Sequence, residues 1–319
     1  MPLDRPALVA DLGATNARFA LVSSAGVADI RILPCRDFPS LEAAIESYLD
    51  QVAPPARPAA AAIAIASPIT GDQVTMTNQA WTFSISGMKA QFGFDRLEVV
   101  NDFTAAALSV PQLGPGDFRQ VGDGKPLPGR AVGVIGPGTG LGVSGLVPTR
   151  EAWQPLAGEG GHVTMAAVTA REEAVLTWLR QKHRHVSAER VLSGMGLTNL
   201  YEAIAALEGE EDAPMRDPPG VTEAGVAGRD PICREAVDMF CGMLGTVAGN
   251  LALTIGAFGG IYIAGGIVPK LGPYFDQSPF RERFIDKGRF RSYLDEIPTY
   301  VITHPTPAFL GLKLVLERP

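Results

Sequence analysis

Two stretches of this chain share one pattern, and together they restrict the fold more than any other feature. Residues 8–22 read Leu-Val-Ala-Asp-Leu-Gly-Ala-Thr-Asn-Ala-Arg-Phe-Ala-Leu-Val, and residues 132–147 read Val-Gly-Val-Ile-Gly-Pro-Gly-Thr-Gly-Leu-Gly-Val-Ser-Gly-Leu-Val. Each is an apolar run, a turn of small residues and a second apolar run, which is typical of a β-hairpin. Glycine permits positive φ and lets a ligand approach the backbone closely. Successive N–H groups in such turns suit phosphate oxygens.

An ordinary tight hairpin explains either stretch alone. The two together favour a duplicated fold that grips one polyphosphate from both sides. The pattern Gly140-Leu-Gly-Val-Ser-Gly145 also matches the dinucleotide-binding fingerprint, which requires a helix to open within it. Here an apolar run of strand type follows instead, so we expect a hairpin and not a nicotinamide-binding site.

Apolar periodicity predicts alternating strands and helices, and therefore an α/β fold with a largely parallel core. Short strands are expected at 74–77 and 81–85 around a turn at Asn78, an inter-lobe crossing at 114–128 and an exposed loop at 208–219. The helix expected at 231–254 is amphipathic. Further strands are expected at 8–12, 17–22, 60–66, 97–101 and 131–135, and helices at 41–52, 104–108, 170–182, 197–207 and 307–316.

Six ordered motifs resemble those of a known family. Asp11–Asn16, Gly136–Gly142 and Gly259–Pro269 resemble the phosphate-1, phosphate-2 and adenosine motifs of the actin-like ATPase superfamily. Between and beyond these turns, three segments are similar to sugar-site segments of the bacterial ATP-dependent glucokinases: Glu98–Ala107, Gly158–His162 and Glu189–Gly194. The resemblance runs from about residue 6 to the C-terminus.

The resemblance implies a two-lobed actin-like ATPase fold, of the duplicated ribonuclease H-like type, with a cleft between the lobes. The small lobe would comprise residues 1–112 and 303–319, and the large lobe residues 113–302. The implied activity is ATP-dependent phosphorylation of glucose at its 6-hydroxyl, with ATP and Mg²⁺ bound and a homodimer as the assembly. A kinase for mannose or fructose and a sugar-sensing regulator on the same scaffold are the alternatives.

Asp102 is the candidate general base, because phosphoryl transfer to a hydroxyl needs one group to receive the proton. It follows an expected strand, where a carboxylate can face a cleft. Asn101 beside it could bind sugar through an amide that both donates and accepts. The alternative is that Asp102 caps the helix expected to start at Thr104.

The resemblance implies sugar contacts at Asn101, Asp102, Glu159, His162 and Glu189. Asn78 is a further candidate because of its place before the strands of the cleft. Glu159 and His162 flank two glycines, whose tight backbone path could aim both side chains at one ligand. A solvated surface turn is the alternative, as a turn asparagine is for Asn78 and a plain charge near a strand is for Glu189. A zinc site at His162 would need further ligands, and the residues directly after it, 163–169, include no cysteine.

The nucleotide contacts implied are Ala10, Asp11, Leu12, Gly13, Ala14, Thr15, Asn16, Gly138, Thr139, Gly265 and Gly266. Asp11, expected at the start of the first turn, would repel phosphate directly, so its expected role is to hold Mg²⁺ through water. The family often has glycine where this chain has Ala14. Because alanine tolerates positive φ poorly, that turn is expected to be altered.

The composition narrows the other partners. The formal net charge of −7 and a pI near 5.2 argue against general binding to nucleic acid or anionic membranes. We expect no apolar run of transmembrane length and no signal peptide. The three scattered cysteines, Cys35, Cys233 and Cys241, are expected to be reduced thiols of a cytoplasmic protein.

Overall fold

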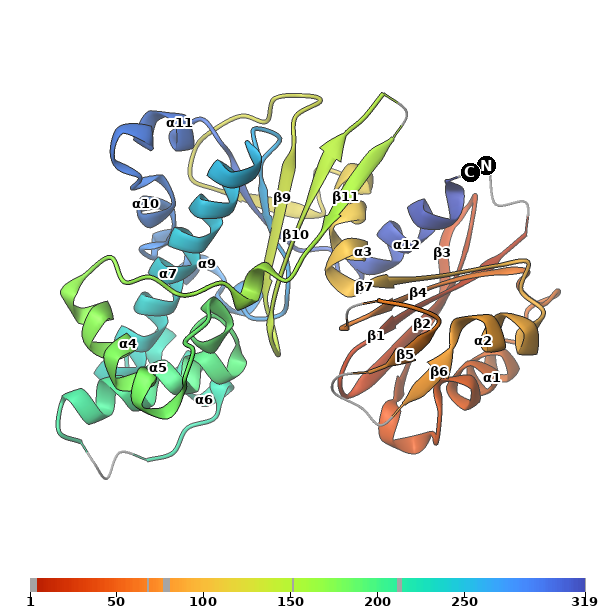
Figure 1. Cartoon of the computed structure of the whole chain (residues 1–319), viewed down its shortest axis with the longest axis horizontal. Coiled ribbons are helices and arrows are strands. Elements are labelled where there is room, and N and C mark those ends of the chain that lie inside the picture. Colours follow the sequence, from red (N-terminus) through yellow and green to blue (C-terminus); the bar gives the residue numbers. More distant parts are fainter. Residues whose placement is uncertain (1–4, 68, 77–80, 151, 211–213, 319) are drawn as a thin grey trace. The chain divides into compact units, whose positions relative to one another are not determined.

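The computed structural model describes residues 5–67, 69–76, 81–150, 152–210 and 214–318 (Figure 1). The chain divides into two compact units. Unit 1 consists of Met1–Gly114 together with His304–Pro319, and unit 2 is Pro115–Thr303. Asn78, one of the expected sugar contacts, lies outside the described residues.

Unit 1 is built on a five-stranded sheet in the order β3-β2-β1-β4-β7. The hairpin expected at 8–22 is confirmed as antiparallel β1 and β2, while β1, β4 and β7 run parallel to one another. The strands are β1 (Ala7–Leu12), β2 (Asn16–Ser23), β3 (Gly26–Pro34), β4 (Ala60–Ile65) and β7 (Arg96–Asn101).

The two faces of this sheet are covered by different helices. Leu8, Phe19 and Ile63 belong to a core that also includes side chains of α1 (Leu41–Val52), which begins where expected with Ser40 as its N-cap. The opposite face packs against α3 (Asp102–Ser109) and α12 (Pro307–Glu317) (Figure 1). This alternation follows from the period of two along a strand.

Helices α3 and α12 lie in close contact. A Cβ at Gly311 would overlap the carbonyl oxygen of Ala105, so only glycine allows α12 this approach to the backbone of α3. Arg96 at the start of β7 donates hydrogen bonds to the carbonyls of Val315, Leu316 and Arg318. The C-terminal helix is thereby fixed both to the sheet and to the helix that begins with Asp102.

A small excursion of unit 1 contains β5 (Gln73–Thr75) and β6 (Thr82–Ser84), which pair antiparallel as expected, followed by α2 (Ile85–Phe92). The short 3-10 helices η1 (Cys35–Asp37) and η2 (Val110–Gln112) complete the unit.

Unit 2 repeats the plan of unit 1 with one extra strand. Its sheet has the order β11-β10-β9-β12-β13-β8, in which β9 and β10 form the second expected hairpin and β9, β12 and β13 are parallel. The bounds are β8 (Phe118–Val121), β9 (Val132–Pro137), β10 (Leu141–Pro148), β11 (Trp153–Ala157), β12 (Ile261–Ile263) and β13 (Thr299–Ile302). The chain passes from unit 1 to unit 2 between Gly114 and Pro115, within the segment 114–128 where a crossing was expected. The same segment also contains β8, which was not expected and which pairs with β13.

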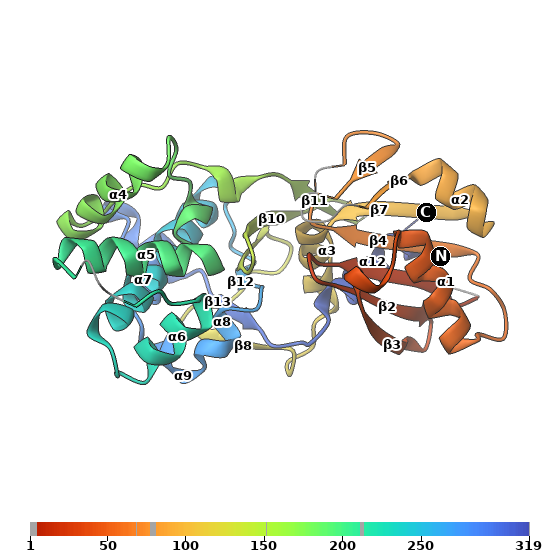
Figure 2. The ribbon, with the colours of Figure 1, turned by 90° about the horizontal axis from the view of Figure 1, so that it is seen from below.

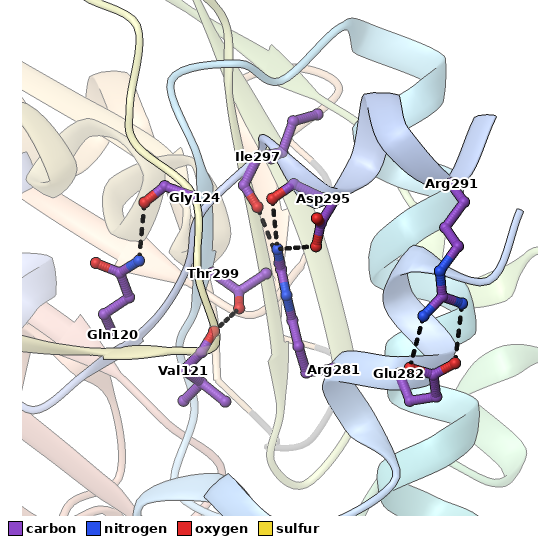
Figure 3. Close-up of polar contacts among 9 residues, drawn as sticks. All are labelled: Gln120, Val121, Gly124, Arg281, Glu282, Arg291, Asp295, Ile297 and Thr299. Atoms are coloured by element: carbon purple, nitrogen blue, oxygen red, sulfur yellow. Dashed lines mark hydrogen bonds and ion pairs between the residues drawn. The ribbon is translucent and has the colours of Figure 1, made fainter.

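Figure 3 shows how the end of β8 is held against neighbouring backbone. Thr299 donates its hydroxyl to the carbonyl of Val121, and Arg281 donates to the carbonyls of Asp295 and Ile297, both at 2.9 Å. The side chain of Arg281 occupies the space that a Cβ at Gly122 would need. These long-range bonds hold the extra strand in place. The sequence of residues 118–121 alone does not predict it.

The helices of unit 2 surround α7 (Pro231–Ile255), with α4, α5 and α6 side by side near it (Figure 2). The helix expected at 231–254 is confirmed as α7. It is long and apolar enough to cross a membrane by length and composition, against expectation, but 78% of its apolar window is buried inside the protein. The remaining helices are α4 (Ala170–Lys182), α5 (Gly194–Leu207), α6 (Pro218–Val226), α8 (Val268–Leu271), α9 (Pro273–Gln277), α10 (Phe280–Ile285) and α11 (Arg291–Asp295), with η3 (Gly160–His162), η4 (Ala188–Arg190) and η5 (Gly288–Phe290).

Candidate functional site

The candidate residues of unit 1 gather at one edge of its sheet. Leu12 lies in register with Ile65, and Ile65 with Asn101. Because β1, β4 and β7 are parallel, the turn after Leu12 and the start of α3 leave the sheet at the same edge, two strand spacings or about 10 Å apart. Carboxyl ends of parallel strands are the usual place for ligands in such sheets.

The turn between β1 and β2 is tight but does not use positive φ. The N–H of Gly13 donates to the carbonyl of Asn16 at 3.0 Å, and the N–H of Cys35 to that of Thr15 at 2.9 Å. Neither Gly13 nor Ala14 is in the left-handed region. Alanine at position 14 therefore meets no strain from positive φ, and the reason given for an altered turn does not apply.

Asp11 lies in β1 and not in the turn itself, with Arg18 opposite it on β2. The guanidinium donates to the carboxylate of Asp11 at 3.1 Å. Burial raises the pKa of Asp11 above its usual value, and the charge of Arg18 opposes that rise. Ala10 and Leu12, on either side, are fully buried in the core, so their side chains are directed away from any ligand at the edge.

Mg²⁺ prefers oxygen ligands and usually keeps several waters, with one or two carboxylates and substrate phosphates completing its shell. A half-buried carboxylate at the end of β1, oriented by Arg18, fits that requirement. Asp11 would therefore suit an ion that is held through water.

Two adjacent residues, Asn101 and Asp102, take the N-cap position and the first position of α3. Asn101 is the N-cap of α3: its side-chain oxygen accepts from the N–H groups of Phe103 at 2.9 Å and Thr104 at 3.3 Å. Asp102 is the first residue of the helix, and one of its carboxylate oxygens also accepts from Phe103 at 2.9 Å. Capping thus orients the Asn101 amide with its NH₂ group directed away from the helix, and the half-buried carboxylate of Asp102 lies at the edge of the sheet.

The second hairpin turn has the same character as the first. The N–H of Gly138 donates to the carbonyl of Gly140 at 2.8 Å, and neither glycine has positive φ, so that part of the expectation was also wrong. A side chain at Gly138 would project into open space, whereas one at Gly140 would overlap the carboxylate of Glu189. The turn therefore leaves room for a ligand on the side of Gly138 only.

Gly265 and Gly266 lie beside this turn. The N–H of Ala264 donates to the carbonyl of Ile135 at 2.8 Å, which continues the pairing of β12 with β9 beyond the strand. Gly265 has a φ of +81°, and a Cβ there would overlap the carbonyl of Pro137. The two predicted nucleotide motifs of unit 2 are thus brought together, and the chain requires glycine at 265 for both reasons.

A cavity of about 1010 Å³ opens next to this turn, entirely within unit 2. Its walls are the turn, the first turn of α5, helix α6 with the residues after it, and the start of α8. The lining residues are Gly138, Thr139, Gly194, Met195, Leu197, Pro218, Pro219, Thr222, Glu223, Val226, Ala227, Arg229, Ile267 and Lys270. A mostly aliphatic wall with a few polar groups is the usual make-up of a small-molecule site.

Most of that lining was missed from the sequence. The N–H of Gly194 donates to the carbonyl of Gly138 at 2.8 Å, which places the N-terminus of α5 against the turn. The exposed loop expected to reach residue 219 ends earlier, because α6 begins at Pro218 with Asp217 as its N-cap. The pair Asp217-Pro218 is an N-cap followed by proline at the first helical position, a signal that could have revealed this helix.

The glycines between Glu159 and His162 allow η3 to lie directly on β10. A Cβ at Gly161 would overlap the carbonyl of Leu141, and the N–H of His162 donates to the carbonyl of Glu159 at 3.0 Å. The side chains of Glu159 and His162 are exposed. The tight path expected here is confirmed, and packing on β10 is its physical cause.

Glu189 is not a plain charge near a strand. It lies in η4, and its Oε2 accepts from the backbone N–H of Leu141 at 2.9 Å. Its Oε1 is 3.9 Å from Nδ1 of His162. The structure therefore brings Glu189, His162 and the start of β10 together. Thr139 and Gly140 directly precede β10 in the chain.

Comparisons with known proteins agree over the full length. The family model described as Glucokinase matches residues 8–319. A glucokinase of Paramagnetospirillum magneticum is 52% identical over 314 residues, covering 98% of both chains, and one of Aromatoleum aromaticum is 50% identical over 315 residues, covering 98% of this chain and 95% of its own.

Solved structures give the same answer for the fold. The crystal structure of a glucokinase from an Antarctic psychrotroph has a TM-score of 0.89 at 38% identity, with 98% of each chain covered. A glucokinase of Balamuthia mandrillaris in complex with glucose has a TM-score of 0.81 at 21% identity, covering 99% of this chain and 94% of that one, which supports the fold alone. The expected duplicated, actin-like α/β fold is confirmed, and the chain belongs to the glucokinase family.

Proposed function

We propose that this protein transfers the γ-phosphoryl group of ATP to the 6-hydroxyl of glucose, giving glucose 6-phosphate and ADP. The observation that carries the proposal is the cavity of unit 2, where an aliphatic wall adjoins the exposed Thr139 of a glycine turn and the N-terminus of α5. A helix N-terminus favours negative charge, and glycine turns favour phosphate. Membership in the glucokinase family supports the same reading.

In this proposal the nucleotide lies in that cavity with its phosphates toward Gly138 and Thr139. The adenosine lies beside Gly265 and Gly266, against the side chains of α6. The turn 13–16 of unit 1 contacts the phosphates from its own side. When bound, Mg²⁺ supplies neutralisation of the phosphate charge, and Asp11 would hold it through water.

We assign the sugar to Asn101 and Asp102 of unit 1 and to Glu159, His162 and Glu189 of unit 2, with Asn78 as a further contact. These side chains offer carboxylate acceptors, imidazole and amide donors, which suits hydroxyls that both donate and accept. Glu189 is already oriented by Leu141, and Asn101 by its capping bonds, so both would bind with little loss of side-chain freedom.

For the chemical step, the protein must position the two reactants and supply one general base. Asp102 accepts the proton of the 6-hydroxyl as that oxygen attacks the γ-phosphorus and the bond to the bridging oxygen of ADP breaks. The helix cap at Asn101 holds the carboxylate of Asp102 in place during this transfer. A solvent-exposed site would offer water as a competing acceptor, so binding of sugar must exclude it.

The test is an assay that couples ADP release to a spectroscopic signal, with glucose, mannose, fructose and no sugar, and with ATP, GTP and polyphosphate as donors. We expect glucose with ATP to give the highest kcat/KM and the sugar-free reaction to be negligible. Equal rates with and without sugar would contradict the proposal, and a clear preference for mannose or fructose would reassign the substrate.

We also propose a cytoplasmic homodimer. Cys233 and Cys241 are buried and form no disulfide within the part of the chain that the structure describes, which fits a reducing compartment. Ile30 and Ile32 on the edge strand β3 are 41% and 57% exposed, and a second copy would shield them. Sedimentation equilibrium of the parent and of an Ile30→Lys/Ile32→Lys variant tests the assembly, because a monomeric parent contradicts it.

A further inference from the structure

A second, smaller concavity of unit 2 is lined mainly by basic residues, whereas the whole chain is acidic. It has a volume of about 400 Å³ and is lined by residues of η3, η4 and the segment that follows α4. We call it the basic pocket. Although the protein carries a net charge of −7, this lining has Lys182, Arg184 and Arg190, three of the four histidines and a single carboxylate, that of Glu189.

The three cations of this lining differ in their partners. Lys182 forms an ion pair with Glu202 at 2.9 Å and lies over the ring of Trp178, so its charge is balanced by these two partners. For Arg184 and Arg190, in contrast, there is no ion pair with any carboxylate among the residues that the structure describes. Two guanidinium groups at one small concavity form a site for an oxyanion, because each can bind it through parallel N–H donors.

Favourable interaction with a helix end does not explain this cluster. Cations near a helix C-terminus interact favourably with its dipole. Arg184 lies two residues after the last residue of α4, so that effect could account for Arg184 alone. Arg190 belongs to η4, and His162 to η3. Three separate segments therefore converge on the pocket, and the effect of one helix covers only one of them.

The other side chains of the pocket are suited to hydroxyl groups. His185 is held by a hydrogen bond between its Nε2 and the hydroxyl of Thr164 at 3.0 Å. His162 and Glu189 both line the pocket and are also the residues to which we assign the sugar. An inorganic anion would meet the carboxylate of Glu189 unfavourably, whereas a ligand with both hydroxyls and a phosphate would satisfy both kinds of group.

The position of the pocket also separates it from the nucleotide. The large cavity is lined by Gly138, Thr139 and Gly194, and the basic pocket by Glu189 and Arg190, so the two share no lining residue. A phosphate bound to Arg184 and Arg190 is therefore not placed at the turn that we assign to ATP.

We propose that the basic pocket binds a phosphorylated hexose, with its phosphate on Arg184 and Arg190 and its hydroxyls on His162 and Glu189. Such a ligand occupies the same two side chains as the substrate and so competes with glucose. The proposed affinity for the phosphorylated hexose is inferred from the residues of the pocket. The proposed competition with glucose rests on the function proposed above.

The test is calorimetric titration of the full chain with glucose 1-phosphate, glucose 6-phosphate, inorganic phosphate and glucose. The variant is Arg184→Gln/Arg190→Gln. The matched control is Arg180→Gln/Arg291→Gln, which removes the same charge from unit 2 at two exposed arginines outside the pocket. Thermal unfolding of all three proteins checks that they fold.

We expect at least one hexose phosphate to bind the parent more tightly than inorganic phosphate does. Its Kd should rise about tenfold or more in the pocket variant, the scale of lost hydrogen bonds to a charged group, and less than about twofold in the control. The Kd of glucose should stay within about twofold in both variants. In the parent, the same hexose phosphate should raise the apparent KM for glucose without changing kcat.

Three results would overturn the inference. They are the absence of hexose phosphate binding, equal weakening in the pocket and control variants, and equal loss of glucose and hexose phosphate affinity, which would make the two arginines part of the sugar site. Failure of the proposed function looks different: glucose would not bind or react, while the arginine-dependent affinity for the phosphate would remain.

Discussion

The carboxylate of Glu189 accepts a hydrogen bond from the backbone N–H of Leu141 at 2.9 Å. This bond links η4 to the first residue of β10, directly after the turn that we assign to the phosphates of ATP. One side chain thus touches the phosphate turn, lies near His162 and lines the basic pocket. The residues of unit 2 that we assign to the sugar and to the nucleotide are therefore linked through Glu189.

Substitution of Glu189 should separate its two roles. Glu189→Gln retains an oxygen that can accept from Leu141, so ATP affinity and the free energy of unfolding should change little, while glucose affinity falls by about 1.5–3 kcal/mol with the charged acceptor. Glu189→Ala leaves the Leu141 N–H without this partner and should weaken both ligands. Calorimetry with each ligand measures this. Equal behaviour of the two variants would show that the bond to Leu141 does not support the turn.

Asp102→Asn should lower kcat by roughly 10²-fold or more and leave glucose affinity nearly intact, because the amide keeps the shape but cannot accept the proton. Asp50→Asn, the same change at an exposed position of α1, is the control and should leave kcat unchanged. Steady-state kinetics and glucose titration measure both. An Asp102→Asn enzyme with more than about half the parent kcat would remove Asp102 from the role of base.

Gly138→Val should damage ATP binding selectively. The residue has no positive φ and its Cβ would project into open space, so the substitution should fold, and its branched side chain would occupy room that we assign to phosphate. Gly116→Val is the matched control, since its Cβ is also unobstructed. We expect ATP affinity to fall at least about tenfold, a loss of some 1.4 kcal/mol, with glucose affinity retained. Loss of both affinities would point to a general defect in unit 2.

Gly311→Ala should destabilise unit 1 and slow the reaction at a distance. The added methyl group would overlap the carbonyl of Ala105 and push α12 away from the helix that begins with Asp102. Overpacking of this kind costs about 1–3 kcal/mol. Denaturant unfolding and kcat are the readouts, with Gly71→Ala, which has open space, as the control. Unchanged stability would mean that the two helices separate at no cost.

Burial raises the pKa of Cys241 to about 12 and that of Cys233 to about 11. Both thiols should therefore stay protonated and unreactive toward iodoacetamide at pH 8 until the protein unfolds. Because the native state holds these protons more tightly than the unfolded chain, whose cysteine pKa is about 8.5, their contribution to stability is complete below that pH.

That contribution is lost as pH rises from about 8.5 toward 12. Mass spectrometry after timed alkylation measures the reactivity, and unfolding at several alkaline pH values compares the parent with Cys241→Ala, whose stability should fall less steeply. Rapid native alkylation of Cys233 or Cys241 would contradict their burial.

Local patterns in the sequence determined the elements and the motifs. The hairpins at 8–22 and 132–147, the helices at 41–52 and 170–182 and the glycines of the Glu159–His162 segment could be read directly, because period, caps and small residues act over a few neighbours. The family resemblance stood on the same short motifs. Where a local rule was applied too literally, as with positive φ at Gly138, the structure corrected it.

Only the tertiary structure decided what those motifs meet. Strand β8 exists through its pairing with β13, most of the apolar window of α7 is buried inside the protein, and α6 becomes a wall of the cavity that we assign to the nucleotide. The bond from Leu141 to Glu189, 48 residues later in the chain, follows from the packing of η4 on the second hairpin. Such contacts depend on which surfaces the fold brings together, and no single segment carries that information because its partner lies far away along the chain.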